Sequence, residues 1–309
     1  MGPSSRLLVA TDLSGPSLRA VDRAFELARE TGASCTVMHA IGMDAAGAWR
    51  GLLGEQADTV SERAVARQRE ALGRLVADQL RARGVRAQVR VERGFATDAV
   101  PECAESLDAS LVVVGAHGHG YLQRVLLGST SSTLLRKSRR PVLVVKAPVR
   151  GPYRRALVPV DFSPGAESAL AFVRRAMPRT ELVLLHVFDV PFESVLRLGG
   201  LPEDVIGGYR VEARERALSQ LHTLARRAGL AAIDYSAVVV HGHPTRQILT
   251  RERHDACDLV VMGKHGTHVT EELLLGSVTK RVLAESRSDV LVVVDERRLE
   301  STVATGAGG

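Results

Sequence analysis

The chain has 309 residues, which predicts two domains of roughly 150 residues each, and its 45% hydrophobic and 25% charged residues exclude a disordered protein. No apolar run reaches the roughly 20 residues of a membrane span and no signal-peptide core is present, so the sequence predicts a cytoplasmic protein without a membrane span. The net charge of +6 is spread along predicted helices and only 4% of residues are aromatic, which argues against nucleic-acid binding.

Apolar runs of strand length alternate with helical patterns along the first half of the chain. The helical period is clearest where Leu18, Val21, Phe25 and Ala28 recur. Strands are predicted at 6–11, 34–41, 85–91, 111–114 and 142–145, and helices at 16–29, 59–83, 97–107 and 129–137. Because fully apolar strands alternate with helices, the sequence predicts an α/β fold whose open parallel sheet has helices on both faces.

The same order recurs in the second half, from 156 to 294, at a spacing of about 148 residues. The segment LVATDLS (8–14) matches LVPVDFS (157–163), and LVVVGAHG (111–118) matches LVVMGKHG (259–266). A period this long is that of whole domains rather than of a solenoid. Two prolines and a glycine within 147–152 mark a linker, so we predict domain 1 at 1–148, domain 2 at 149–298 and a flexible tail at 299–309.

Two features repeat at the ends of predicted strands. Asp12 and Asp161 directly follow the first strand of each half, close to a helix start, where a turn or capping role is also typical. After the fourth strand, a glycine pattern recurs with identical spacing, as Gly115-x2-Gly118-x9-Gly128-Ser129-Thr130 and as Gly263-x2-Gly266-x9-Gly276-Ser277-Val278. These glycines are predicted to allow positive φ and close backbone approach, and the Gly-Ser pair offers free N–H groups to a phosphate at a helix start.

The predicted topology brings the two features together. In an open parallel sheet, ligands bind beyond the carboxyl ends of the strands, where the strand order reverses. A carboxylate suits ribose hydroxyls or a base amino group, and an N–H-rich loop suits phosphates, so the predicted ligand is a nucleotide. Neither the dinucleotide fingerprint Gly-x-Gly-x-x-Gly nor a Walker loop is present.

On these residues the chain resembles the universal stress protein family, twice and over nearly its whole length. The G-x2-G-x9-G-[S/T] spacing, the V-x-x-D-x-S start and the histidine at the end of strand two are typical of the family's nucleotide-binding branch. The resemblance implies two five-stranded parallel sheets in the order 3-2-1-4-5, the adenine nucleotide alpha-hydrolase-like fold. It also implies that each half binds ATP or a similar adenine nucleotide, with or without Mg²⁺.

The resemblance further implies site residues, position by position. Those near the adenosine part are Asp12 and Asp161, with an adenine slot and its surroundings formed by Ala10, Ala40, Val114, Pro159, Val187 and Met262. Those near the phosphates are Gly115, Gly118, Gly128, Ser129 and Thr130 in the first half, and Gly263, Gly266, Gly276, Ser277 and Val278 in the second. The segments PVDFS and LLLGSV make the second half the closer match. No catalytic or metal-ligating residue is assigned.

Histidines and cysteines give weaker signals. We predict that His39 and His186, at the ends of the second strands, are structural. The histidines of the glycine loops leave a phosphate or metal contact open, whereas His241 and His243 lack a carboxylate or cysteine at a convincing offset, so no metal site is predicted there. The three cysteines lie far apart without a CxxC motif and are predicted to be small buried hydrophobes in a reducing compartment.

Three functions remain open from the sequence. A nucleotide-dependent stress or signalling module, acting on an unknown protein partner, is favoured. A slow ATP hydrolase or phosphotransferase would need a base or an arginine aimed at the γ-phosphate, and the repeated motifs supply neither, so enzymatic activity is left uncertain. A scaffold with vestigial sites would have broken glycine motifs, and both are intact.

The last strand of each half, at 142–145 and 290–293, is an apolar run that would otherwise leave an exposed sheet edge. The two halves are therefore predicted to pair as an intramolecular pseudo-dimer. A homodimer of tandem chains through another surface is left open.

Overall fold

The computed structural model of the chain describes residues 4–42, 56–117, 128–190, 192–266 and 275–295, so the predicted tail at 299–309 lies outside the described residues. The contacts divide the chain into two compact units. The first is built on the residues up to Pro152 together with Asp289–Val292, and the second on the other described residues from Tyr153 onward. Within the described residues, no helix is long and apolar enough to cross a membrane.

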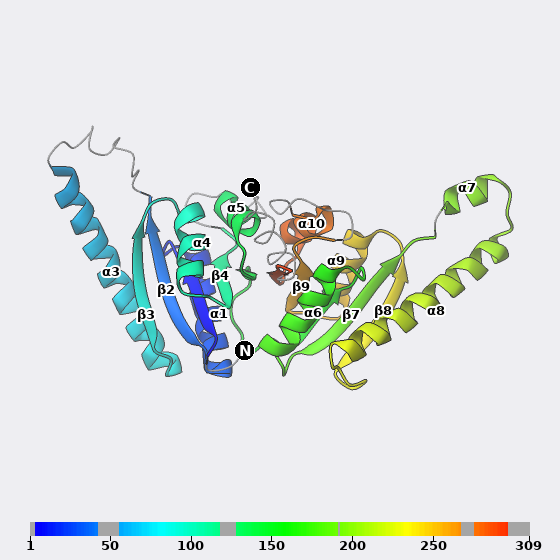
Figure 1. The fold of residues 1–309 in the computed structure, drawn as a ribbon, viewed down its shortest axis with the longest axis horizontal. Helices are drawn as coiled ribbons and strands as arrows, with labels where there is room; N and C mark the ends of the chain where they lie inside the picture. Colours follow the sequence, from blue (N-terminus) through cyan, green and yellow to red (C-terminus); the bar gives the residue numbers. More distant parts are fainter. Residues whose placement is uncertain (1–3, 43–55, 118–127, 191, 267–274, 296–309) are drawn as a thin grey trace, which may run out of the picture. The chain divides into compact units, whose positions relative to one another are not determined.

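The first unit contains the predicted alternation of strands and helices (Figure 1). Its elements are β1 (Arg6–Ala10), α1 (Gly15–Thr31), β2 (Ser34–Ile41), α3 (Gln56–Arg83), β3 (Ala87–Arg93), α4 (Ala96–Ser106), β4 (Leu111–Gly115), α5 (Ser129–Lys137) and β5 (Val142–Val145). The strands are parallel in the order β3-β2-β1-β4-β5, which confirms the predicted order 3-2-1-4-5. The chain therefore reverses its direction of winding between β1 and β4, where the two repeated motifs lie.

The second unit repeats this plan (Figure 1). Its elements are β6 (Arg155–Pro159), α6 (Pro164–Ala176), β7 (Glu181–Phe188), α7 (Glu193–Leu198), α8 (Glu203–Arg227), β8 (Tyr235–His241), α9 (Pro244–His254), β9 (Leu259–Gly263) and α10 (Ser277–Glu285), followed by β10 (Asp289–Val293). Parallel strands run in the order β9-β6-β7-β8. At the end of β10, the Val293 carbonyl accepts a hydrogen bond of 2.8 Å from the Lys264 N–H.

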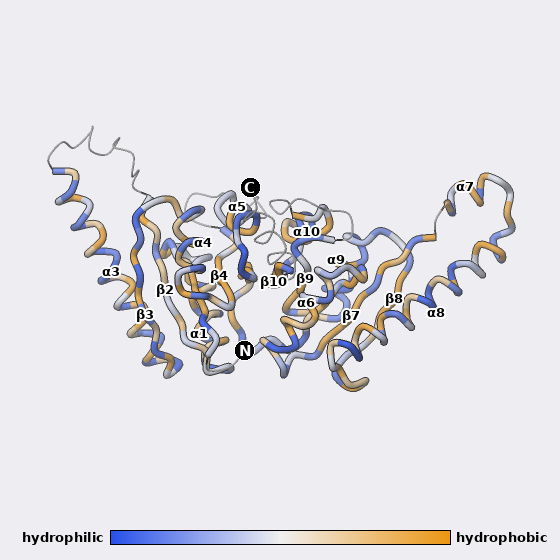
Figure 2. The backbone as a smooth tube through the Cα atoms, viewed as in Figure 1, coloured by the Kyte–Doolittle hydropathy of each residue, from blue (hydrophilic) through white to orange (hydrophobic). Residues whose placement is uncertain are grey.

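Burial differs between the strands of the first unit. All residues of β4 and β5 are buried, whereas the residues of β3, on which α3 packs, are intermediate or exposed. The two long helices α3 and α8 show the matching amphipathic pattern, with hydrophobic and hydrophilic stretches alternating along each (Figure 2). The predicted α/β fold, a parallel sheet with helices packed on it, is therefore confirmed, and β3 is its least buried strand.

The serine of each D-x-S motif begins a helix. Ser14 caps α1, where its hydroxyl accepts from the Ser17 N–H, and Ser163 caps α6, where its hydroxyl accepts from the Ala166 N–H. A proline in the first turn suits both helices because its missing N–H would have no intrahelical acceptor there. The caps fix where each helix starts and thereby set the position of the aspartate two residues earlier.

Candidate functional site

The second unit has a cavity of about 310 Å³ beyond the carboxyl ends of its central strands. The nine residues predicted for a site in this half all line it, namely Pro159, Asp161, Val187, Met262, Gly263, Gly266, Gly276, Ser277 and Val278. The remaining lining residues are Val160, Ala166, Leu185, Pro244, Ile248, His265 and Thr279. The structure therefore gathers residues from β6, β7, β9, α9 and α10 around one space of ligand-binding size.

The first unit has a smaller cavity at the equivalent place, of about 150 Å³. Six of the residues predicted for this half line it, namely Ala10, Asp12, Ala40, Val114, Gly115 and Thr130. Gly128 and Ser129 lie at the start of α5 without lining the cavity, and Gly118 lies outside the described residues.

Each aspartate of the site is held in a tight turn. An Oδ1 oxygen accepts a hydrogen bond from the backbone N–H two residues on, from Ser14 to Asp12 at 3.0 Å and from Ser163 to Asp161 at 3.1 Å. The turn interpretation is therefore right for one oxygen of each carboxylate. In the second unit the other oxygen, Oδ2, faces the glycine loop, since a Cβ placed on Gly266 would lie 2.8 Å from it.

The residue after each aspartate has a left-handed backbone, with φ of 63° at Leu13 and 59° at Phe162. This region is unfavourable for a residue with a side chain and costs on the order of 1 kcal/mol or more. The same conformation occurs in both units, so the strained turn is a property of the repeated motif. It aims the preceding aspartate at the cavity.

The histidines at the ends of the second strands hold this turn from the opposite side. The Nδ1 atoms of His39 and His186 lie 2.7 Å from the carbonyl oxygens of Thr11 and Val160, which directly precede the aspartates. A carbonyl oxygen can only accept, so Nδ1 carries the proton and the tautomer is fixed. These bonds confirm the structural role predicted for both histidines.

The glycines that end β4 and β9 serve close packing within the protein. A Cβ on Gly115 would lie 2.8 Å from the Pro16 carbonyl oxygen, and one on Gly263 would lie 2.8 Å from the backbone of Gly165. None of the motif glycines among the described residues has positive φ, so the prediction of positive φ was wrong for them. Their smallness lets each strand end lie against the start of the helix that carries the aspartate turn.

Gly276 is different, because a Cβ there would meet no atom of the described residues closer than 3.7 Å. Its backbone, at φ −54° and ψ 144°, is open to other residues. The packing of the described residues therefore does not require a glycine at this position. A ligand that approaches the backbone closely would require one.

The start of α10 is tied to the end of β9 and faces the cavity. The Gly276 N–H donates to the Lys264 carbonyl at 3.0 Å, and the Thr279 hydroxyl donates to the Gly263 carbonyl at 3.1 Å. The first N–H groups of a helix have no intrahelical acceptor, and α10 has no acidic residue in its first turn. Ser277 and Val278 thus present the positive end of a helix to the cavity, which is a favourable place for an anion.

One wall of each cavity was not predicted from the sequence. Pro244 and Ile248 come from α9 in the second unit, and Ala96 and Val100 come from α4 in the first. These helices follow the third strand of each repeat, and the predicted strand order already placed their starts at the same edge of the sheet. These four residues were not predicted because their side chains carry no polar or titratable group.

The cysteines take no part in either cavity. Cys35, Cys103 and Cys257 are free and buried, as predicted, and none lines a described cavity. Burial raises the pKa of the Cys35 and Cys257 thiols to about 12, which keeps both protonated and unreactive at neutral pH.

Comparison with known proteins finds one family in both repeats. The model of the Universal stress protein family matches residues 4–146 and again 152–294. A universal stress protein of Mycolicibacterium smegmatis is 32% identical over 304 residues, which is 93% of this chain and 96% of that protein. Universal stress protein Rv2005c of Mycobacterium tuberculosis is 34% identical over 216 residues, which is 66% of this chain and 68% of that protein.

Solved structures agree on the fold. The crystal structure of a universal stress protein from Archaeoglobus fulgidus has a TM-score of 0.66 and 23% sequence identity to this chain. The likeness covers 94% of this chain and 99% of that one, so the shared architecture extends over both repeats.

Proposed function

Since this chain belongs to the universal stress protein family, we propose that the cavity of each repeat binds ATP or a similar adenine nucleotide, and that a protein partner reads the occupied state. The observation that carries the proposal is that Asp161 and the first N–H groups of α10 line one cavity of about 310 Å³. A carboxylate and a helix N-terminus are complementary to the two ends of a nucleotide, its hydroxyl-bearing sugar and its phosphates.

The walls of the cavity suit the base. Pro159, Val187 and Met262 supply apolar surface next to Asp161. Transfer of an adenine ring from water to such a surface lowers the free energy and so favours binding. In the proposed pose, the Asp161 carboxylate accepts from a ribose hydroxyl and the N–H groups of Ser277 and Val278 donate to phosphate oxygens. The bare Gly276 leaves room for the phosphates to approach the backbone.

Binding is favoured over catalysis by the composition of the cavities. Among the described lining residues, the titratable groups are Asp12 and Asp161 together with His39, His117 and His265. Rapid phosphoryl transfer requires positive charge at the γ-phosphate and a group that orients the nucleophile, and these residues supply neither an arginine nor a lysine. ATP hydrolysis by the purified protein is accordingly expected far below the roughly 1–100 per second of kinases.

The proposal is tested by calorimetric titration of the full chain with ATP, in the presence and absence of Mg²⁺. Saturable binding with up to two equivalents per chain is expected. One universal stress protein, with a TM-score of 0.33 to this chain, has been solved in complex with cAMP, so cAMP and ADP are included as competitors. If none of the three nucleotides binds at millimolar concentration, the proposal fails.

Two further expectations belong to this proposal. The buried free cysteines suit a reducing compartment such as the cytoplasm. The pairing of the two halves as a pseudo-dimer, and a homodimer through another surface, stay predictions. Sedimentation of the full chain with and without ATP would measure the oligomeric state.

A further inference from the structure

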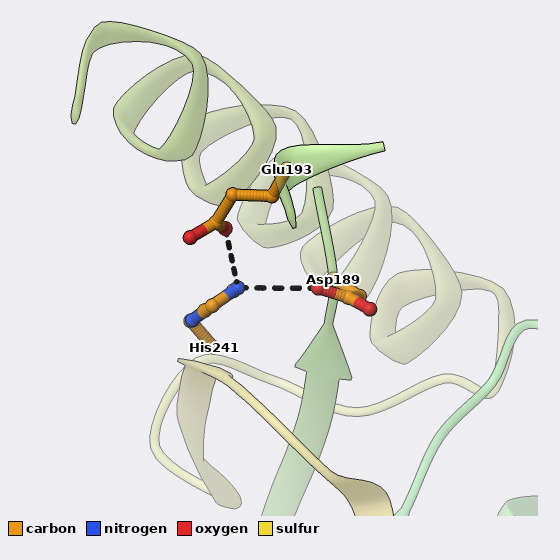
Figure 3. A group of neighbouring side chains, drawn as sticks. All are labelled: Asp189, Glu193 and His241. Carbon is orange, nitrogen blue, oxygen red and sulfur yellow. Dashed lines mark hydrogen bonds and ion pairs between the residues drawn. The ribbon is translucent and has the colours of Figure 1, made fainter. Parts of the chain in front are cut away.

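Three side chains of the second unit converge outside the proposed nucleotide cavity (Figure 3). Asp189 follows the end of β7, Glu193 begins α7, and His241 ends β8. One atom of His241, the ring nitrogen Nε2, lies 3.2 Å from Asp189 Oδ1 and 3.1 Å from Glu193 Oε2. None of the three residues lines the cavity described above.

The distances match those between neighbouring donor atoms around a small metal ion. Zinc bonds of about 2.0–2.2 Å to nitrogen and oxygen, set at tetrahedral angles, place adjacent donor atoms roughly 3.3 Å apart. All three donor atoms lie within 4.8 Å of one another. Small side-chain adjustments would therefore bring all three donor atoms onto one ion.

The arrangement suits a cation better than hydrogen bonding alone. A neutral imidazole with its proton on Nε2 has one N–H to share between two carboxylates, and a single N–H makes one well-aligned bond. With the proton on Nδ1, the Nε2 lone pair and both carboxylates point at the same space. That set of one nitrogen and two oxygen donors is complete for a divalent ion once water takes the fourth position.

Arginines hold the glutamate in place for this role. The Oε1 atom of Glu193 accepts from Arg197 at 3.1 Å and from Arg210, and the Nε of Arg210 also donates to Oε2 at 3.3 Å. Hydrogen bonds to a carboxylate's second oxygen are the usual means of orienting a metal ligand.

We propose that Asp189, Glu193 and His241 bind one divalent transition-metal ion, with zinc as the best match to a nitrogen and two carboxylate oxygens. The ion joins the ends of β7 and β8 to α7. Both strand ends are close in sequence to residues that line the nucleotide cavity. Val187 lies in β7, and Pro244 follows the end of β8. The metal site stands on its own residues and does not depend on nucleotide binding.

Among its described residues, the first unit has no counterpart of His241. The strand register pairs Phe188 with His241 in the second unit and Ile41 with Arg93 in the first, so an arginine stands where the second unit has its histidine. An arginine cannot ligate a metal ion because its guanidinium stays protonated. The chain itself thus supplies the substitution that should remove the site, His241→Arg.

The test is a calorimetric titration of the full chain with zinc, without nucleotide, comparing the natural protein with His241→Arg and His241→Ala. The matched control is His243→Ala, which removes an exposed histidine two residues away that is outside the group. The natural protein and the control should bind one more equivalent than the two His241 variants, in which the affinity of that site should fall at least about 100-fold. Circular dichroism checks that all four proteins are folded.

Cobalt provides a second readout, because tetrahedral Co²⁺ absorbs visible light far more strongly than octahedral hydrated Co²⁺ does. The natural protein and His243→Ala should show this absorption, and His241→Ala should lose it. The proposal is overturned if the natural protein binds no zinc saturably, or if His241→Ala binds as many equivalents with the same affinity.

Discussion

The two cavities are built on the same motif, yet that of the second repeat is about 310 Å³ and that of the first about 150 Å³. The two walls also differ in chemistry at two positions, where the first repeat has Thr11 and Ser17 and the second has Val160 and Ala166. In the first repeat the two hydroxyls lie 2.8 Å apart and bond to each other. One cavity thus has an internally satisfied polar wall, and the other has an apolar wall with no hydrogen bonds to lose when a base arrives.

The largest expected difference between the two sites is produced by Gly276→Val. We expect ATP binding at the second site to fall below detection, because the branched side chain fills space that the protein leaves open and the phosphates need. Loss of a glycine at the helix start costs stability of only about 1 kcal/mol. The matched change Gly128→Val should spare the second site. Calorimetry with ATP measures both, and equal affinity in Gly276→Val and the natural protein would show that the start of α10 does not hold phosphate.

The next largest effect is expected from Asp161→Ala, at about 1.5–3 kcal/mol of ATP binding free energy, or roughly 10–150-fold in affinity. Asp161→Asn is the control for the turn, because an amide oxygen can still accept from the Ser163 N–H. Because its amide oxygen can also accept from a ribose hydroxyl, the Asp161→Asn protein should keep the fold and part of the ATP affinity. Identical affinities of all three proteins would reduce Asp161 to a turn residue.

A smaller effect is expected when the first wall is made like the second, by the double change Thr11→Val with Ser17→Ala. The two hydroxyls also accept from the Leu13 N–H at 3.0 Å and from the Asp12 N–H at 3.3 Å, so the double change should cost about 1 kcal/mol or more of stability, because these backbone donors lose their acceptors. ATP affinity at the first site should rise several-fold as the wall becomes apolar. Titration in a Gly276→Val background isolates that site, and an unchanged or lower affinity would mean that the hydroxyl pair itself contacts the nucleotide.

The smallest expected effect concerns the stability of the first repeat at low pH. In α1 of the first repeat, a hydrogen bond from Arg29 holds the pKa of the Glu26 carboxyl below its ordinary value. A lowered folded pKa contributes stability above the unfolded value of about 4.3, and that contribution is lost as pH falls through the folded pKa. Glu26→Gln should therefore lower stability at pH 7 slightly and flatten its decline below pH 4. Urea unfolding at both pH values measures this, and parallel curves would contradict it.

The helices and strands were predicted well because their signals, hydrophobic periodicity and capping residues, lie within each segment. The runs at 129–137 and 142–145 became α5 and β5 with the expected bounds. Helix starts follow from capping serines, and the order of the sheet followed from the family resemblance. The glycines were identified for the wrong physical reason, since smallness rather than positive φ explains them.

What could not be predicted are contacts between segments far apart in the sequence. Ile248 of α9 carries no chemical signal, yet it lines the nucleotide cavity. His241 seemed to lack a carboxylate partner because Asp189 lies 52 residues earlier, directly after the end of the neighbouring parallel strand. The spacing of a motif identifies ligands that are close together in the sequence. Neighbouring strands of a parallel sheet are joined by a long connection, so ligands at their ends are far apart in the sequence.

The left-handed turn after each aspartate bears on how a nucleotide would bind. In the second repeat the Phe162 ring lies 4.5 Å from the ring of His186, whose Nδ1–H fixes the Val160 carbonyl. The aspartate is thus braced on both sides before any ligand arrives, and the entropy of ordering it is lost when the protein folds. Association with Asp161 should therefore need no slow rearrangement of the turn, and differences in affinity between nucleotides should be found mainly in how fast they leave.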